Sequence, residues 1–114
     1  MASRRIERVN RRIKEVASRA ILYELKDPRV GFCTVTKVET SADLKTAKIH
    51  VSVMGRQEDE RNTFRALEHA RGHIQGKIAA ELATRFSPVI EFIPDQTIKA
   101  SIRIGEILRK DRET

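Results

Sequence analysis

The chain has 114 residues and a mass of 13.0 kDa, which suits one ordinary domain rather than two. Its 23 Lys and Arg residues outnumber 16 Asp and Glu residues, and the net charge of +7 favours a polyanionic partner, with nucleic acid first. No apolar run approaches the ~20 residues of a membrane span or resembles a signal peptide, so we expect a soluble, cytoplasmic protein. The single cysteine, Cys33, excludes an intrachain disulfide and a zinc site built on several thiolates.

The first half of the chain predicts one helix and two strands. Residues 3–25 form the predicted helix, because their apolar side chains recur at spacings of three and four residues. Asp27-Pro28 ends it, since proline disfavours helical geometry at the residue before it. Residues 30–39 are rich in Val and Thr, and residues 46–54 alternate apolar with polar side chains. The short turn between these two strands predicts an antiparallel hairpin.

The second half of the chain predicts further helix and a third strand. A helical pattern runs from about residue 58 to Phe86, but it contains Gly72 and Gly76, each of which costs about 1 kcal/mol relative to alanine. We therefore expect a bend, or a break into two helices. Residues 89–93 form the third strand, and residues 97–109 allow a short further helix. The prediction is a single domain over residues 1–114, ordered helix-strand-strand-helix-helix-strand, with residues 96–114 as a C-terminal helix or tail.

The basic charge is concentrated on the first predicted helix. At about 100° per residue, six arginines fall in one sector beside the apolar stripe, and we call them the arginine ridge: Arg4, Arg5, Arg8, Arg11, Arg12 and Arg19. The planar guanidinium suits paired hydrogen bonds to phosphate oxygens. Cations at a helix N-terminus oppose the macrodipole, so local helix stability does not account for them. We hypothesise that the ridge binds nucleic-acid backbone; the alternative is a solvated face that serves solubility.

Several segments, in their order and spacing, resemble the bacterial ribosome-binding factor A family. The most distinctive is Ala70-Arg71-Gly72, which matches the Ala-x-Gly interruption that replaces the usual Gly-x-x-Gly loop of KH domains in that family. The resemblance runs nearly end to end, to about Leu108, and its other segments are Asp27-Pro28-Arg29-Val30-Gly31-Phe32, Thr34-Val35-Thr36-Lys37-Val38, Ser41-Ala42-Asp43-Leu44, Ala47-Lys48, Val51-Ser52-Val53-Met54-Gly55 and Asp95-Gln96-Thr97-Ile98. It implies an α+β fold: a KH-like domain of the second topological type (α-β-β-α-α-β), with a three-stranded sheet packed on helices.

The resemblance also implies a function. Members of the family are non-enzymatic ribosome assembly factors that bind the free or immature small (30S) subunit, contact the 16S rRNA precursor and aid its late maturation, particularly in the cold. Carried over to this sequence, the resemblance implies a bend at Ala70, Arg71 and Gly72, where the protein backbone contacts RNA. It also implies that Arg71 and Lys77 supply positive charge there. A steric role for Gly72, relieving crowding where two helices turn, is the alternative. We expect a monomer without cofactor, membrane contact or small-molecule substrate.

Chemistry that would indicate an enzyme is scarce in the sequence. His69 and His73 have the spacing of two zinc ligands, but Ala70 stands where a metalloprotease carries its glutamate, and no third ligand is evident. Cys33 has no recognisable base nearby in sequence. We expect neither a metal site nor catalysis. The remaining alternative is a generic DNA- or RNA-binding protein that uses the basic N-terminal helix, although no helix-turn-helix or basic zipper supports a DNA-binding role.

Overall fold

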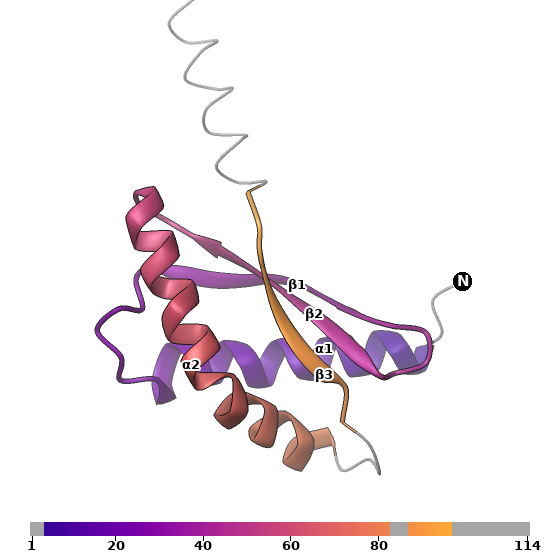
Figure 1. Cartoon of the computed structure of the whole chain (residues 1–114). Helices are drawn as coiled ribbons and strands as arrows, with labels where there is room; N and C mark the ends of the chain where they lie inside the picture. Colours follow the sequence, from indigo (N-terminus) through magenta and orange to yellow (C-terminus); the bar gives the residue numbers. More distant parts are fainter. Residues whose placement is uncertain (1–3, 83–86, 97–114) are drawn as a thin grey trace, which may run out of the picture.

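A computed structural model describes residues 4–82 and 87–96 of the chain (Figure 1). Its elements are the helix α1 (Arg4–Arg19), the π-helical turn η1 (Ala20–Glu24), the strands β1 (Cys33–Thr40) and β2 (Thr46–Val53), the helix α2 (Gln57–Leu82) and the strand β3 (Val89–Pro94). The predicted order of helix, two strands, helical segment and final strand is confirmed, except that one helix stands where two were predicted. The predicted helix over residues 97–109 and the tail up to residue 114 lie outside the described residues, apart from Gln96.

The three strands form a mixed sheet in the order β1-β2-β3. β1 and β2 are antiparallel, as the short turn between them predicts, and a register shift lies between Val35 and Lys37. β3 runs parallel to β2, with Val89 opposite Thr46 and Pro94 opposite Val51. Because parallel neighbours need a long crossover, α2 is the element that carries the chain from the end of β2 back to the start of β3.

Alternation along the strands places the core on one face of the sheet. Buried strand residues such as Val35, Ile49 and Ile90 pack with residues of both helices, and in β1 the register shift changes which positions are buried. The apolar helix residues with no exposed surface are Ile13, Ala17, Leu67, Ile74 and Ile78. The other face of the sheet is mainly polar, with Lys37, Glu39, Lys48, His50 and Glu91. Both helices therefore pack their apolar stripes against the same face of the three-stranded sheet.

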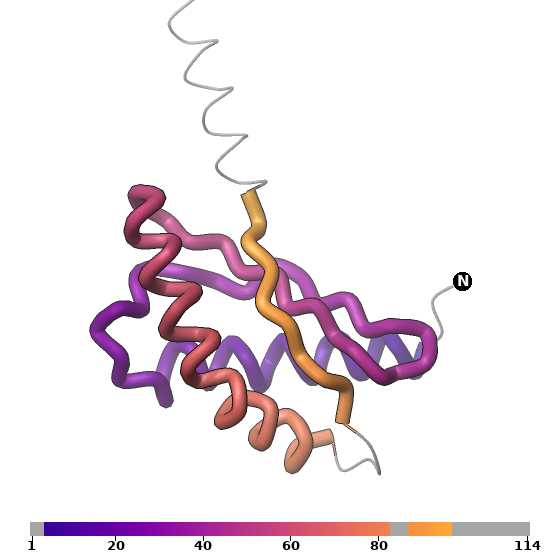
Figure 2. Tube along the Cα trace, in the orientation of Figure 1, coloured from indigo at the N-terminus to yellow at the C-terminus, as the bar shows by residue number. Residues whose placement is uncertain are grey.

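α2 differs from the sequence prediction in one respect. Gly72 and Gly76 do not divide it, because residues Gln57–Leu82 form a single helix of 26 residues. The tube in Figure 2 shows that its axis changes direction part-way along, so the helix bends without breaking. Two glycines cost the helix about 2 kcal/mol together, and the buried contacts of Leu67, Ile74 and Ile78 on both sides of Gly72 hold it as one element.

α1 ends in an irregular turn. The backbone N–H of Leu25 donates to the carbonyl of Ala20 at 3.0 Å, five residues earlier, which is the hydrogen-bond pattern of a π-helix. After Asp27 and Pro28 the chain reverses and enters β1. The sequence-predicted end of the first helix near Leu25 is confirmed, but its last turn is π-helical rather than α-helical.

Candidate nucleic-acid interface

The arginine ridge is divided in the structure into a free part of four arginines and a paired part of two. Arg4, Arg5, Arg8 and Arg11 are exposed on α1, and within residues 4–82 and 87–96 no carboxylate lies within ion-pair distance of them. They are the four N-terminal members of the ridge. Their guanidinium groups are exposed to solvent on one sector of the helix, where their positive charge opposes the helix macrodipole. They are therefore open to an external anion.

The paired part of the ridge joins α1 to α2. The guanidinium groups of Arg12 and Arg19 both donate to the carboxylate of Glu81, and the hydrogen bond from Arg19 is 3.1 Å long. Arg12 also donates to Glu15 on its own helix at 3.0 Å. These two arginines therefore have a structural role that the sequence pattern did not reveal. Glu81 stands near the end of α2, and nothing in its sequence position indicates a partner 62 to 69 residues away.

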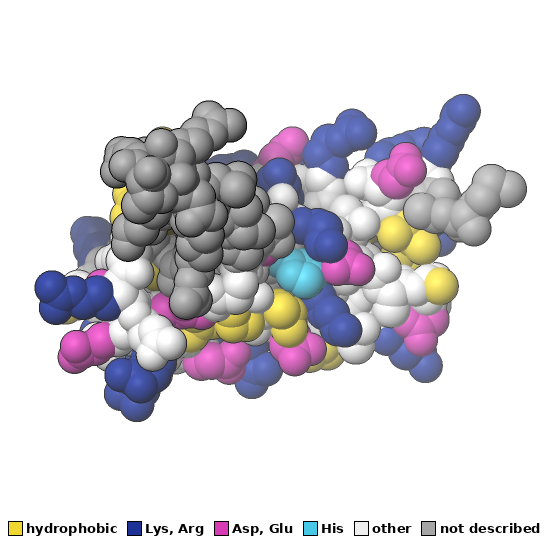
Figure 3. All heavy atoms as spheres, turned by 90° about the horizontal axis from the view of Figure 1, so that it is seen from above, with side chains coloured by type: hydrophobic (Ala, Val, Ile, Leu, Met, Phe, Trp, Pro, Cys, Tyr) yellow, Lys and Arg dark blue, Asp and Glu magenta, His cyan; other side chains and the backbone are white. Residues whose placement is uncertain are grey.

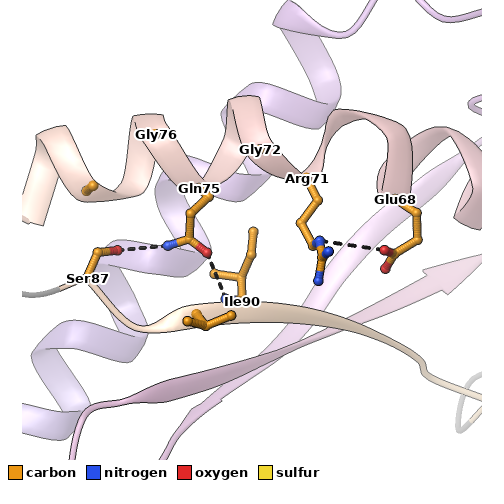
Figure 4. Close-up of a pocket in the computed structure, with 9 residues that line it drawn as sticks. Glu68, Arg71, Gly72, Gln75, Gly76, Ser87 and Ile90 are labelled. Carbon is orange, nitrogen blue, oxygen red and sulfur yellow. Dashed lines mark hydrogen bonds and ion pairs between the residues drawn. The ribbon is translucent and has the colours of Figure 1, made fainter.

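The residues predicted around Gly72 line a groove between α2 and β3. The groove has a volume of about 630 Å³ and is lined on the helix by Glu68, Arg71, Gly72, Gln75, Gly76 and Ala79, and on the other side by Ser87, Val89 and Ile90 (Figure 4). Both glycines are exposed, and a Cβ atom added at either would meet no atom within 4 Å. The steric explanation for Gly72 is therefore wrong: no crowding is relieved there, and its lack of a side chain leaves helix backbone open to the groove.

Gln75 fixes one wall of this groove. Its side-chain amide donates to the Ser87 hydroxyl at 2.9 Å and to the Pro88 carbonyl at 2.6 Å, while its amide oxygen accepts from the backbone N–H of Ile90 at 2.9 Å (Figure 4). One side chain thus satisfies three polar groups where the chain enters β3. The sequence analysis missed Gln75, because only the fold brings its side chain to the start of β3.

The cations predicted near the bend are paired with carboxylates. The Arg71 guanidinium lies 3.6 Å from Glu68, and Figure 4 shows both side chains extending from α2 on the side of β3. The Lys77 ammonium lies 3.8 Å from Glu24 of η1, and the same carboxylate is 3.4 Å from His73. Arg71 and Gly72 share the groove, whereas Lys77 belongs to the contact between α2 and η1. The structure therefore does not bring all predicted RNA-binding residues together.

The surface carries its charges in a mixed pattern. Figure 3 shows that Lys and Arg side chains are spread over the face seen from above, with acidic side chains among them. Among the described side chains, no group of three or more His, Cys, Asp and Glu residues is placed to hold a metal ion. Burial raises the pKa of the Cys33 thiol. A thiol with a raised pKa has little thiolate at neutral pH, which is unfavourable for a nucleophile.

The comparisons with known proteins decide the family. Residues 5–108 match the family model of ribosome-binding factor A. The chain belongs to the ribosome-binding factor A family. Ribosome-binding factor A from Carboxydothermus hydrogenoformans is 44% identical over 108 residues, which cover 95% of this chain and 86% of the relative.

Two solved structures place the fold within the same family. The crystal structure of ribosome-binding factor A from Thermus thermophilus is 25% identical and superimposes with a TM-score of 0.68, covering 78% of this chain and 94% of that one. A homology model of the Thermus thermophilus factor, fitted into a cryo-EM map of a complex of the 30S subunit with that factor, is 24% identical, with a TM-score of 0.61, and the match covers 84% of this chain and 97% of that one. The α+β, KH-like architecture is confirmed. In the described part of the chain neither helix is long and apolar enough to cross a membrane.

Proposed function

We propose that the protein is a non-enzymatic ribosome assembly factor that binds the small (30S) subunit and contacts its 16S rRNA precursor. Membership of the ribosome-binding factor A family supports this proposal, as does the map of the Thermus thermophilus factor on the 30S subunit. The structural observation that carries it is the free part of the arginine ridge. Four exposed guanidinium groups, with no carboxylate partner in the described part of the chain, form a surface suited to the RNA backbone.

The groove between α2 and β3 supplies a second RNA contact in this proposal. Open backbone at Gly72 and Gly76 lets a ribose-phosphate chain approach the helix closely, and Arg71 lies in the same groove. Its ion pair with Glu68 is exposed and long, at 3.6 Å, so exchanging that carboxylate for a phosphate costs little. Lys77 lies outside the groove, beside Glu24 of η1, and adds only attraction at longer range.

The mechanism that follows is selection of an RNA conformation rather than bond chemistry. A protein that binds one conformation of the precursor better than another shifts the population towards the first. Misfolded RNA helices escape slowly at low temperature, so the proposed function includes a greater demand in the cold and late maturation of 16S rRNA. We place the protein in the cytoplasm, where ribosomes are assembled, and expect it to act as a monomer.

The test measures RNA affinity against salt concentration. Neutralising four phosphates gives a log-log slope of roughly −3 for binding to small-subunit precursor RNA. Reversing Arg4, Arg8 and Arg11 to glutamate should weaken binding and bring the slope close to zero. Lys14→Glu is the matched single-charge control for Arg8→Glu, because Lys14 is an exposed cation on α1 outside the ridge sector. It should weaken binding much less than Arg8→Glu.

Three outcomes would contradict the proposal. An affinity that does not respond to salt excludes a phosphate contact. Equal effects of Lys14→Glu and Arg8→Glu show that only the net charge matters. Duplex DNA that competes as well as small-subunit RNA at equal salt points to a generic nucleic-acid-binding protein instead.

A further inference from the structure

The turn between β1 and β2, residues 41–45, is strained at one residue, and we call it the hairpin tip. Leu44 has φ of 60°, and among the described residues it is the one non-glycine residue in the left-handed region. In that region the β-carbon of an L residue crowds its own backbone, so glycine or asparagine is the usual occupant. A leucine at this position is therefore unfavourable for the turn itself.

Hydrogen bonds on both sides hold Leu44 in this conformation. The N–H of Leu44 donates to the carbonyl of Ser41 at 2.9 Å, and the N–H of Ser41 donates to the carbonyl of Thr46 at 2.9 Å. The Asp43 carboxylate accepts from the Ser41 hydroxyl at 2.6 Å and from the N–H of Lys45 at 3.1 Å. Because these bonds fix the backbone around Leu44, the strain is maintained and the hairpin tip has one defined shape.

The hydrophobic core does not use the side chain of Leu44. Leu44 is half-buried, but it is not one of the half-buried apolar residues in the described part of the chain that pack against the core. Neither the turn nor the core therefore accounts for a leucine at this position. Strained residues concentrate at contact sites, so this leucine points to a partner outside the protein.

The hairpin tip lies beside the free arginines. Asn10 of α1 accepts hydrogen bonds from the backbone N–H and from the hydroxyl of Thr40, at 2.8 Å and 2.5 Å. Figure 2 shows the hairpin running along the N-terminal half of α1, with its tip near the start of that helix. The bonds to Asn10 therefore place the hairpin tip next to the part of α1 that carries Arg4, Arg5, Arg8 and Arg11.

The charge around the hairpin tip is mainly positive. Residues 4–11 hold four arginines and one acid, Glu7, and the tip adds the exposed Lys45 and Asp43. The Asp43 carboxylate is already used by hydrogen bonds within the turn. An apolar side chain surrounded by cations is suited to a nucleotide, because the cations attract its phosphates while leucine packs on its base.

We propose that the hairpin tip binds an unpaired nucleotide of the small-subunit RNA, with Leu44 packed on its base and Lys45 and Arg11 near its phosphates. This inference rests on the proposed function, because it assumes that the free arginines bind RNA at all. The bases of an A-form duplex are stacked on one another, and only an unpaired base offers its face to a side chain. Leu44 thus adds a preference for unpaired positions to a basic surface that otherwise binds any RNA backbone.

The test compares two RNA duplexes that are identical except for one bulged adenine. The unmodified protein should bind the bulged duplex about fivefold more tightly. Leu44→Asn should abolish this preference and leave the affinity for the fully paired duplex unchanged. The same substitution should raise the melting temperature by a few degrees, because asparagine tolerates a positive φ. Leu44→Met keeps an apolar side chain and should retain most of the preference.

Leu22→Asn is the matched control. Leu22 is 63% exposed on η1, at the opposite end of the first helical segment from the hairpin tip, so the same change of side chain is made far from the proposed contact. This variant should keep the fivefold preference. Arg11→Glu should lower the affinity for both duplexes, because both carry phosphates.

The outcomes separate this inference from the proposed function. Equal affinities of the unmodified protein for the two duplexes, both dependent on salt, overturn the inference and leave the proposed function standing. The inference is also wrong if Leu44→Asn keeps the preference, or if Leu22→Asn loses it. A lower melting temperature of Leu44→Asn would show that the side chain serves the fold, which again contradicts the inference. If the protein binds neither duplex nor the 16S rRNA precursor, the proposed function fails together with the inference.

Discussion

Glu81 shows how one residue alters the role of its neighbours. Its carboxylate accepts hydrogen bonds from Arg12 and Arg19, so a third of the predicted arginine ridge is used inside the protein. The wheel of α1 places all six arginines in one sector, but a helical wheel has no information about a carboxylate on another helix. The arginine ridge thus has two roles: Arg12 and Arg19 link the two helices, and the other four arginines are available to an external partner.

Glu81→Ala separates these two functions. Loss of two partly exposed ion pairs should lower the free energy of unfolding by about 1 kcal/mol, measured by urea denaturation. The same change frees Arg19 and leaves Arg12 paired with Glu15 alone, so affinity for small-subunit RNA should rise a few-fold. Glu7→Ala, which removes the same charge from an α1 residue without an ion pair in the described part of the chain, is the control. A fall in RNA affinity with Glu81→Ala would mean that Glu81 holds the arginines in their binding position.

At the scale of elements, α2 keeps two glycines that its own stability does not need. Gly72→Ala places a methyl group in open space within a helix, so it should stabilise the protein by about 1 kcal/mol and raise the melting temperature by roughly 4 °C. If RNA backbone approaches the helix here, the same methyl group should weaken RNA binding. A stabilised variant with unchanged RNA affinity would show that the groove does not take RNA.

Gly55→Ala is the contrasting substitution. Gly55 has φ of 124°, a conformation that L side chains rarely adopt, so alanine there should destabilise the protein by about 1 kcal/mol or more. Thermal unfolding of both variants side by side tests the distinction: one glycine is required by the turn into α2, and the other is retained on an open helix surface. If both substitutions raised the melting temperature, or both lowered it, this distinction between the two glycines would be wrong.

At the scale of the whole molecule, periodicity predicted the elements and missed the links between them. The strand alternation around Ile49 and the stripe around Ile13 are local signals, and both gave the correct buried face. The continuity of α2 across Gly72 depends on core contacts made on both sides of it, and the bonds of Gln75 and Glu81 join residues that only the fold brings together.

The separation of the two proposed contact regions leads to a prediction for the intact protein. Arg8 lies in the first half of α1, whereas Arg71 lies in the groove between α2 and β3 and pairs with Glu68. Sites on separate elements, without shared partners, act independently. In a double-mutant cycle of Arg8→Glu and Arg71→Glu on the immature small subunit, the losses in binding free energy should add to within about 0.5 kcal/mol. A combined loss equal to the larger single loss would instead mean that both residues serve one contact, reached only when the protein is seated in a single orientation.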